Sequence, residues 1–179
     1  MPHLLCLGFG FTATALTCAL GPAWRVTGTT RSAEGLKAVR DAGAEPLLWP
    51  GEELTPALAQ ATHVLSSVPP RDAGDPAYDL IAAHVGRMPK LEWLGLLSTT
   101  GVYGDQDGDW VDEDAPLVPA THRGGLRATQ NAAWMGLFED HALPVHIFRL
   151  AGIYGPGRSA FDKLRDGTAR RIVKPGQVF

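Results

Sequence analysis

The sequence predicts an α/β fold in which a doubly wound parallel sheet carries helices on both faces. Short apolar or β-branched segments alternate with helix-like segments from one end of the chain to the other, and this alternation is typical of βαβ units with right-handed crossovers. The first segment, 3–7, is an unbroken apolar run, as expected for a strand buried on both faces. The balance of 45% hydrophobic and 20% charged residues is that of a globular domain.

Each element has a local signal. Gly21-Pro22 ends the first helix, while Ser32 begins the second and Gly43 ends it. Strands are expected at 3–7, 24–28, 45–49, 63–68, 91–98 and 145–150, and helices at 11–20, 33–42, 56–61, 77–88, 123–141 and 159–167. In the long helix 123–141, the apolar side is expected to consist of Leu126, Ala133, Leu137 and Phe138.

Composition excludes several classes of partner. A length of 179 residues is typical of one domain, and a net charge of −3 offers no basic surface for nucleic acid or anionic lipid. The apolar N-terminus lacks the Lys or Arg of a secretion signal, and no apolar run is long enough to cross a membrane. We therefore expect a cytoplasmic protein without a metal site. Cys6 and Cys18 are expected to be buried, reduced thiols.

A glycine-rich turn follows the first strand. Gly8-Phe9-Gly10-Phe11-Thr12-Ala13 fits the pattern G-x-G-x-x-G/A between a strand and a helix. Gly8 makes the turn, Gly10 lets the backbone approach a pyrophosphate, and Ala13 allows close packing of the helix on the strand. Phe11 and Thr12 begin the helix, whose N-terminus attracts the anion. This pattern predicts a dinucleotide-binding Rossmann fold.

The end of the second strand indicates which dinucleotide is bound. An NAD site usually has a carboxylate there for the ribose 2′-hydroxyl, whereas an arginine accommodates the 2′-phosphate of NADP. This chain has Thr30-Arg31-Ser32 and no carboxylate before Glu34. Arg31 is a forked donor with hydroxyl neighbours. NADP is therefore expected, with NAD the less favoured alternative.

Together with the glycine turn, two later motifs resemble the extended short-chain dehydrogenases/reductases, the superfamily of NAD-dependent epimerases and dehydratases acting on nucleotide sugars. They are Ser-Thr-Thr-Gly-Val-Tyr-Gly at 98–104 and Arg-Leu-Ala-Gly-Ile-Tyr-Gly-Pro-Gly at 149–157. The resemblance covers 3–179. It implies an NAD(P)-binding domain at 1–158 and the start of an incomplete substrate-binding region at 159–179, in a fragment or a natural truncation.

The resemblance also implies catalytic positions. Thr99 matches the Ser or Thr that hydrogen-bonds the reacting oxygen. The family's acid/base pair Y-x-x-x-K is replaced, because Arg123 stands at the Tyr position and Arg127 at the Lys position. Arginine stays protonated and is a poor proton donor, so we expect this pair to hold an anionic substrate group. Proton transfer would then fall to another group, for which the candidates are His122, Tyr103 and Tyr154.

Further contacts are expected by the same resemblance. Cofactor contacts are expected from Ser67 and Val68 after the fourth strand, and from Gly152 and Ile153 after the sixth. The residues expected to face the substrate are Tyr103, Tyr154 and Arg158. The polar segment 101–122, with six acidic residues, is interpreted as a functional loop over one end of the sheet.

Two functions remain open. One is an NADP-dependent oxidoreductase or epimerase/dehydratase acting on a nucleotide-sugar-like or other small carbonyl or hydroxyl compound. The other is a non-catalytic module that binds NADP(H) as a redox sensor or contacts a partner. A homodimer is expected through helices 77–88 and 123–141, with Trp134, Met135 and Phe138 supplying apolar area.

Overall fold

The computed structural model describes residues 1–171 and confirms the α/β fold class. Six parallel strands form one sheet in the order β3-β2-β1-β4-β5-β6. The chain therefore starts in the middle of the sheet, builds one half outward to β3, and returns to build the other half from β4. The strands are β1 His3–Leu7, β2 Arg25–Thr30, β3 Glu45–Leu48, β4 His63–Ser66, β5 Trp93–Thr99 and β6 Val145–Leu150.

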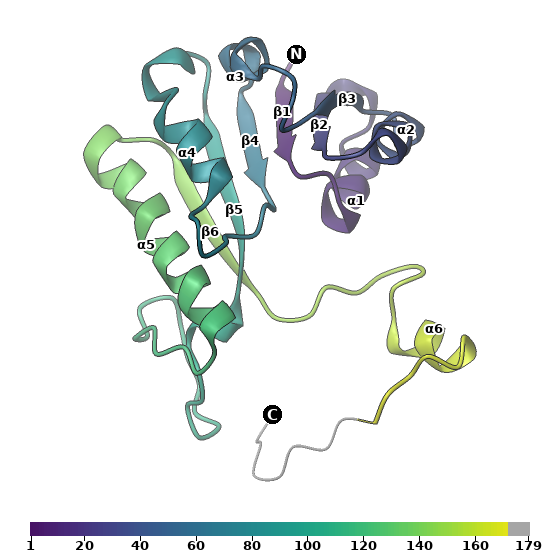
Figure 1. Cartoon of the computed structure of the whole chain (residues 1–179), viewed down its shortest axis with the longest axis vertical. Coiled ribbons are helices and arrows are strands. Elements are labelled where there is room, and N and C mark those ends of the chain that lie inside the picture. Colours follow the sequence, from purple (N-terminus) through teal and green to yellow (C-terminus); the bar gives the residue numbers. More distant parts are fainter. Residues whose placement is uncertain (172–179) are drawn as a thin grey trace.

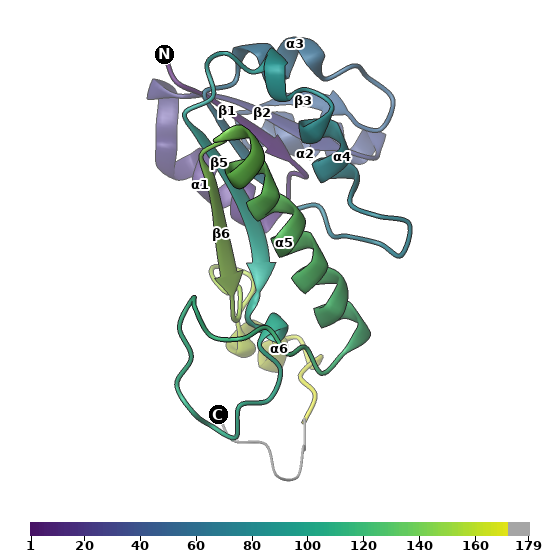
Figure 2. The ribbon, with the colours of Figure 1, turned by 90° about the vertical axis from the view of Figure 1, so that its left-hand side faces the viewer.

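Helices cover both faces of the sheet, with α1 and α2 on one side and α4 and α5 on the other (Figures 1 and 2). The α-helices are α1 Phe11–Leu20, α2 Ala33–Asp41, α3 Thr55–Gln60, α4 Pro76–Ala82, α5 His122–His141 and α6 Ala160–Arg165. Ser32 caps α2 by accepting from the Gly35 amide, and Thr121 caps α5 in the same way through Gly124. Three short 3₁₀ turns are η1 Gly21–Ala23, η2 Val85–Arg87 and η3 Thr100–Val102.

Each face of the sheet has its own hydrophobic core, because successive strand residues point to opposite faces. Leu5 and Leu7 of β1 pack in the larger core with residues of α3, α4 and α5. Leu4 and Cys6 pack in the smaller core with α1 and α2. The apolar run at 3–7 is thus a strand buried on both faces, as predicted.

The buried side of α5 differs from the prediction. Leu137 is buried as predicted, whereas Phe138 is 52% exposed. The other residues that the helix buries were not predicted, and they are Gly124, Arg127, Gln130, Asn131 and Trp134. Three of these side chains are polar, and two of them have hydrogen-bond partners from distant segments. Apolar spacing cannot indicate a face that is buried through polar contacts.

Three other expectations are corrected. The helix expected at 77–88 ends at Ala82 and gives way to the 3₁₀ turn η2. Trp134 is completely buried, with its indole N–H bound inside the protein, so it offers no area to a dimer interface. Cys18 is exposed on α1, whereas Cys6 is buried in the sheet.

The chain leaves the sheet after β6 and runs past the N-terminal end of α1 to the short helix α6 (Figure 1). All six strands lie within residues 1–158, the range predicted for the NAD(P)-binding domain. The domain boundary between 158 and 159 stays a prediction. The last residues of the predicted second part, 172–179, lie outside the described residues. Within 1–171, no helix is both long and apolar enough to span a membrane.

Candidate functional site

The glycine turn has a backbone that requires glycine at its first position. Gly8 has φ +82°, and its amide donates to the Thr29 hydroxyl at 2.8 Å. A Cβ at Gly8 would lie 2.7 Å from Oγ of Ser67, which itself donates to the Gly8 carbonyl at 3.0 Å. A Cβ at Gly10 would meet no atom within 4 Å, so the surface in front of Gly10 is open. Hydrogen bonds to Thr29 and Ser67 thus hold the turn at Gly8, while its surface at Gly10 is accessible to a ligand.

Two cavities flank this turn at the carboxyl ends of the strands. The first, of about 460 Å³, lies toward β5, β6 and α5. The second, of about 350 Å³, lies toward the ends of β2 and β3. Ser67 lines both cavities at the point between β1 and β4 where the strand order reverses. Ligands of doubly wound sheets bind in the crevice at this position.

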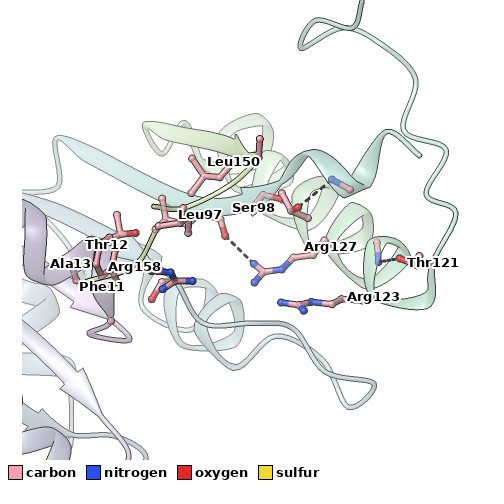
Figure 3. Close-up of a pocket in the computed structure, with 17 residues that line it drawn as sticks. Phe11, Thr12, Ala13, Leu97, Ser98, Thr121, Arg123, Arg127, Leu150 and Arg158 are labelled. Atoms are coloured by element: carbon pink, nitrogen blue, oxygen red, sulfur yellow. Dashed lines mark hydrogen bonds between the residues drawn. The ribbon is translucent and has the colours of Figure 1, made fainter. Parts of the chain in front are cut away.

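The first cavity joins the start of α1 to the start of α5 (Figure 3). Its only ionisable lining groups among the described residues are the guanidinium groups of Arg123, Arg127 and Arg158. The other lining residues are Gly10, Phe11, Thr12, Ala13, Ser67, Leu97, Ser98, Thr99, Gly101, Thr121, Gly124, Leu150, Ala151 and Ile153. The cavity therefore carries positive charge without a lining carboxylate.

Thr99 and Arg127 are held by well-defined hydrogen bonds. Oγ1 of Thr99 accepts from the Gly101 amide at 3.1 Å, which leaves the hydroxyl proton available for another acceptor. Nη1 of Arg127 donates to the Leu97 carbonyl at 2.9 Å and to Oε1 of Gln130 at 3.0 Å. Burial and the charge of Arg123 lower the pKa of Arg127 from its usual value, against the opposing effect of Asp75.

Arg123 and Arg127 extend in the same direction from α5 (Figure 3). They are one turn apart on the helix, where like charges repel each other. Arg158 reaches the cavity from the segment after β6, with its guanidinium carbon 5.3 Å from the centre of the Phe11 ring. Three cations from two distant segments thus face one space that would suit an anion.

The second cavity contains all but one of the residues predicted to contact the adenosine end of a dinucleotide. Thr30 and Arg31 line it together with Val68, and apolar walls come from Phe9 and Trp49. The remaining lining residues are Gly8, Thr29, Pro50, Ser67, Pro69, Arg71 and Pro76. Arg71 did not emerge from the sequence, because it stands in a loop without a motif.

Five candidates from the sequence line neither cavity. Ser32 caps α2, and Gly152 lies on the segment after β6. The Tyr103 hydroxyl accepts from Nη1 of Arg149 at 2.7 Å, inside the protein, whereas Tyr154 is 82% exposed. Nε2 of His122 lies 3.0 Å from Oδ1 of Asp72 on the exposed surface.

A buried network behind the first cavity includes further residues that sequence reasoning missed. Oδ2 of Asp75 accepts from Nε2 of Gln130 and from Nε1 of Trp134, each at 2.7 Å. Oδ1 of the same carboxylate caps α4 by accepting from the Ala77 amide. Because Gln130 also accepts from Arg127, the network connects Asp75 to the wall of the cavity. No motif could have revealed it, since its members are up to 59 residues apart.

Sheet order, glycine turn and the cavities beside it together define a Rossmann fold. Solved structures with this fold include UDP-glucuronic acid 4-epimerase from Bacillus cereus in complex with NAD, with TM-score 0.74, 21% identity, and coverage of 93% of this chain and 61% of that chain. Another is dTDP-glucose 4,6-dehydratase from Bacillus anthracis str. Ames in complex with NAD, with TM-score 0.73, 17% identity, and coverage of 93% and 62%.

More similar sequences are found among proteins whose names state no activity. A functionally unknown conserved protein from Silicibacter pomeroyi DSS is 49% identical, with TM-score 0.89, over 100% of this chain and 62% of that chain. Protein YeeZ of Escherichia coli (strain K12) is 31% identical over 88% of this chain and 61% of YeeZ. The chain thus spans about three fifths of the length of these relatives. No model of a known protein family matches it.

Proposed function

We propose that this chain is the NADP(H)-binding part of an oxidoreductase or epimerase/dehydratase whose small carbonyl or hydroxyl substrate carries an anionic group. The observation that carries this proposal is the pair of cavities on either side of the glycine turn, one lined by Arg31 and the other by Arg123, Arg127 and Arg158. Similarity to epimerases and dehydratases solved with NAD supports the cofactor class.

The residues present fit a dinucleotide. Helix α1 has no side-chain cap at Gly10 and no acidic residue in its first turn, so its N-terminal amides are available to a pyrophosphate. The open surface at Gly10 gives the pyrophosphate room to approach. In the second cavity, Phe9 and Trp49 offer flat apolar surface to a base, and Arg31 offers a fork to a 2′-phosphate.

The first cavity would receive the nicotinamide and the substrate. When bound, the cofactor supplies hydride donation or acceptance. Thr99 would donate its hydroxyl proton to the reacting oxygen, since its lone pair already accepts from Gly101. Arg123, Arg127 and Arg158 would bind a carboxylate or phosphate of the substrate. Nη1 of Arg127 is held by Leu97 and Gln130, and the other N–H groups of its guanidinium would bind the anion.

A second candidate function has its own support. Among residues 1–171, the first cavity is lined by no Tyr, His, Lys, Cys, Asp or Glu, and arginine is a poor proton donor at neutral pH. A non-catalytic module that binds NADP(H) would need no such group. The enzyme and the binding module would bind the same cofactor, but only the enzyme would convert a substrate.

Two experiments test these proposals. Calorimetric titration of the native chain should give tighter binding of NADPH than of NADH, by roughly tenfold to a hundredfold, and Arg31→Asp should reverse the order. Equal affinities in the native chain would remove Arg31 from this role. NADPH oxidation by the whole protein, with small carbonyl compounds that do or do not carry a carboxylate, then separates the enzyme from the binding module.

Arg127→Lys tests the anion site. Lysine keeps the charge but not the fork. We expect weaker binding of the carboxylate-bearing substrate and nearly unchanged binding of NADPH. Loss of turnover in Arg123→Gln with unaltered substrate affinity would instead assign Arg123 to the chemical step.

A further inference from the structure

We infer that Arg71 is a second specificity-determining residue, which acts with Arg31 as a two-arginine clamp for a phosphate on the adenosine ribose of the cofactor. This inference rests on the proposed function and deepens it. Both arginines line the second cavity, Arg31 after β2 and Arg71 in the loop after β4. They thus approach the same space from strands on opposite sides of β1.

Charge in the second cavity favours an anion. None of its lining residues is Asp or Glu, and no ion pair or side-chain hydrogen bond is found for Arg31 or Arg71 within residues 1–171. The carboxylate next to Arg71 in the chain, that of Asp72, contacts the ring of His122 and not Arg71. Two guanidinium groups therefore face this cavity without a carboxylate partner. A dianionic phosphate would neutralise both, whereas a ribose hydroxyl would neutralise neither.

Arg71 is presented by a turn with defined geometry. The Arg71 amide donates to the Gly74 carbonyl and the Gly74 amide donates back, each at 2.9 Å. Gly74 has φ +117°, a conformation that favours glycine. The turn leads directly into the buried Asp75, which α5 holds through Gln130 and Trp134. The backbone under Arg71 is thus fixed without any ligand.

Position distinguishes this role from a contact with the pyrophosphate. The pyrophosphate is expected at Gly10 and the start of α1, which line the first cavity and not the second. Arg71 shares its cavity with Thr30 and Arg31, at the end of β2 where dinucleotide folds read the 2′ position. The inference therefore predicts an effect on NADPH that is absent for NADH.

The test is calorimetric titration of NADPH, NADH, 2′,5′-ADP and 5′-AMP into the native chain, Arg71→Gln and a matched control, Arg87→Gln. Arg87 is exposed and lines neither cavity. Arg71→Gln should weaken the binding of NADPH and 2′,5′-ADP by roughly tenfold to a hundredfold. The affinities for NADH and 5′-AMP should stay within about twofold of those of the native chain. Arg87→Gln should change none of them. The double variant Arg31→Gln/Arg71→Gln should lose less NADPH binding free energy than the sum of the losses in the two single variants, because both side chains bind the same phosphate.

Three outcomes would overturn the inference. Equal weakening of NADPH and NADH would place Arg71 on a part common to both, and unchanged NADPH binding would leave Arg71 without a role. If the native chain binds neither NADPH nor NADH, the proposed function is refuted, and the clamp is then tested by titration of 2′,5′-ADP alone. Binding of 2′,5′-ADP that depends on Arg71 would still support the clamp, whereas failure of 2′,5′-ADP to bind would refute it.

Discussion

Removing the Asp75 carboxylate should destabilise the protein more than any exposed charge does. Asp75→Ala abolishes three hydrogen bonds, from the Ala77 amide at the start of α4 and from the buried side chains of Gln130 and Trp134. Loss of the cap costs about 1 kcal/mol, and each buried donor left without a partner costs about 1–3 kcal/mol. The sum is about 3–7 kcal/mol, a large part of the ~5–15 kcal/mol of a typical domain.

Urea denaturation followed by far-UV circular dichroism would measure this loss. Asp75→Asn keeps one acceptor oxygen, so it should cost only about 1–2 kcal/mol. The matched control is Asp41→Ala, which removes an exposed ion pair with Lys37 on α2 and should cost ~0.5 kcal/mol or less. If Asp75→Ala were no more destabilising than Asp41→Ala, the network would not stabilise the fold and the reasoning would be refuted.

Three further predictions concern other parts of the chain. Burial, followed by the charge of Arg25, lowers the pKa of His3, so the unfolded state binds the proton more readily; the unfolding free energy should fall as the pH drops below about 6.5. His3→Gln should remove that part of the pH dependence in urea titrations at pH 5 and 7.5. Burial raises the pKa of the Cys6 thiol to about 12, so a thiolate-specific reagent should modify Cys18 alone in the native chain and both cysteines in denaturant. Met135 and Phe138 are 37% and 52% exposed on α5; light scattering at tens of micromolar should give a dimer that charged substitutions there dissociate, and a native monomer would contradict this.

The parts of the fold that sequence could predict depend on neighbours in the chain. A buried strand, a glycine turn and the helix after it lie within 20 residues, and the turn at Gly8 was found because its φ requires glycine. Ser32 as the cap of α2 is equally local. The alternation of strands and helices predicts the doubly wound fold class, whereas the order of the strands comes from the structure. Local rules therefore sufficed for the fold class and for one side of the candidate site.

The parts that sequence could not predict depend on contacts between distant residues. The polar side of α5 is buried because Asp75 and Leu97 accept its hydrogen bonds, and neither acceptor is visible from the spacing of α5 itself. Tyr103 was a candidate because it stands beside Thr99 in a motif, yet its hydroxyl is bound by Arg149, 46 residues away. Arg71 has no motif and reaches its cavity only through tertiary structure.

The tie between the Arg71 turn and α5 has a consequence for the entropy of binding. Fixing one backbone residue costs about 1–2 kcal/mol of conformational entropy, and a loop that becomes ordered only around its ligand loses that amount from its affinity. Here the backbones of Arg71 and Gly74 are already hydrogen-bonded to each other, and Asp75 holds the end of the turn. The backbone entropy is therefore lost when the protein folds and not when the ligand binds. The Arg71 and Gly74 amides should therefore exchange their hydrogens slowly in the free protein, and adding a phosphorylated nucleotide should slow that exchange little further.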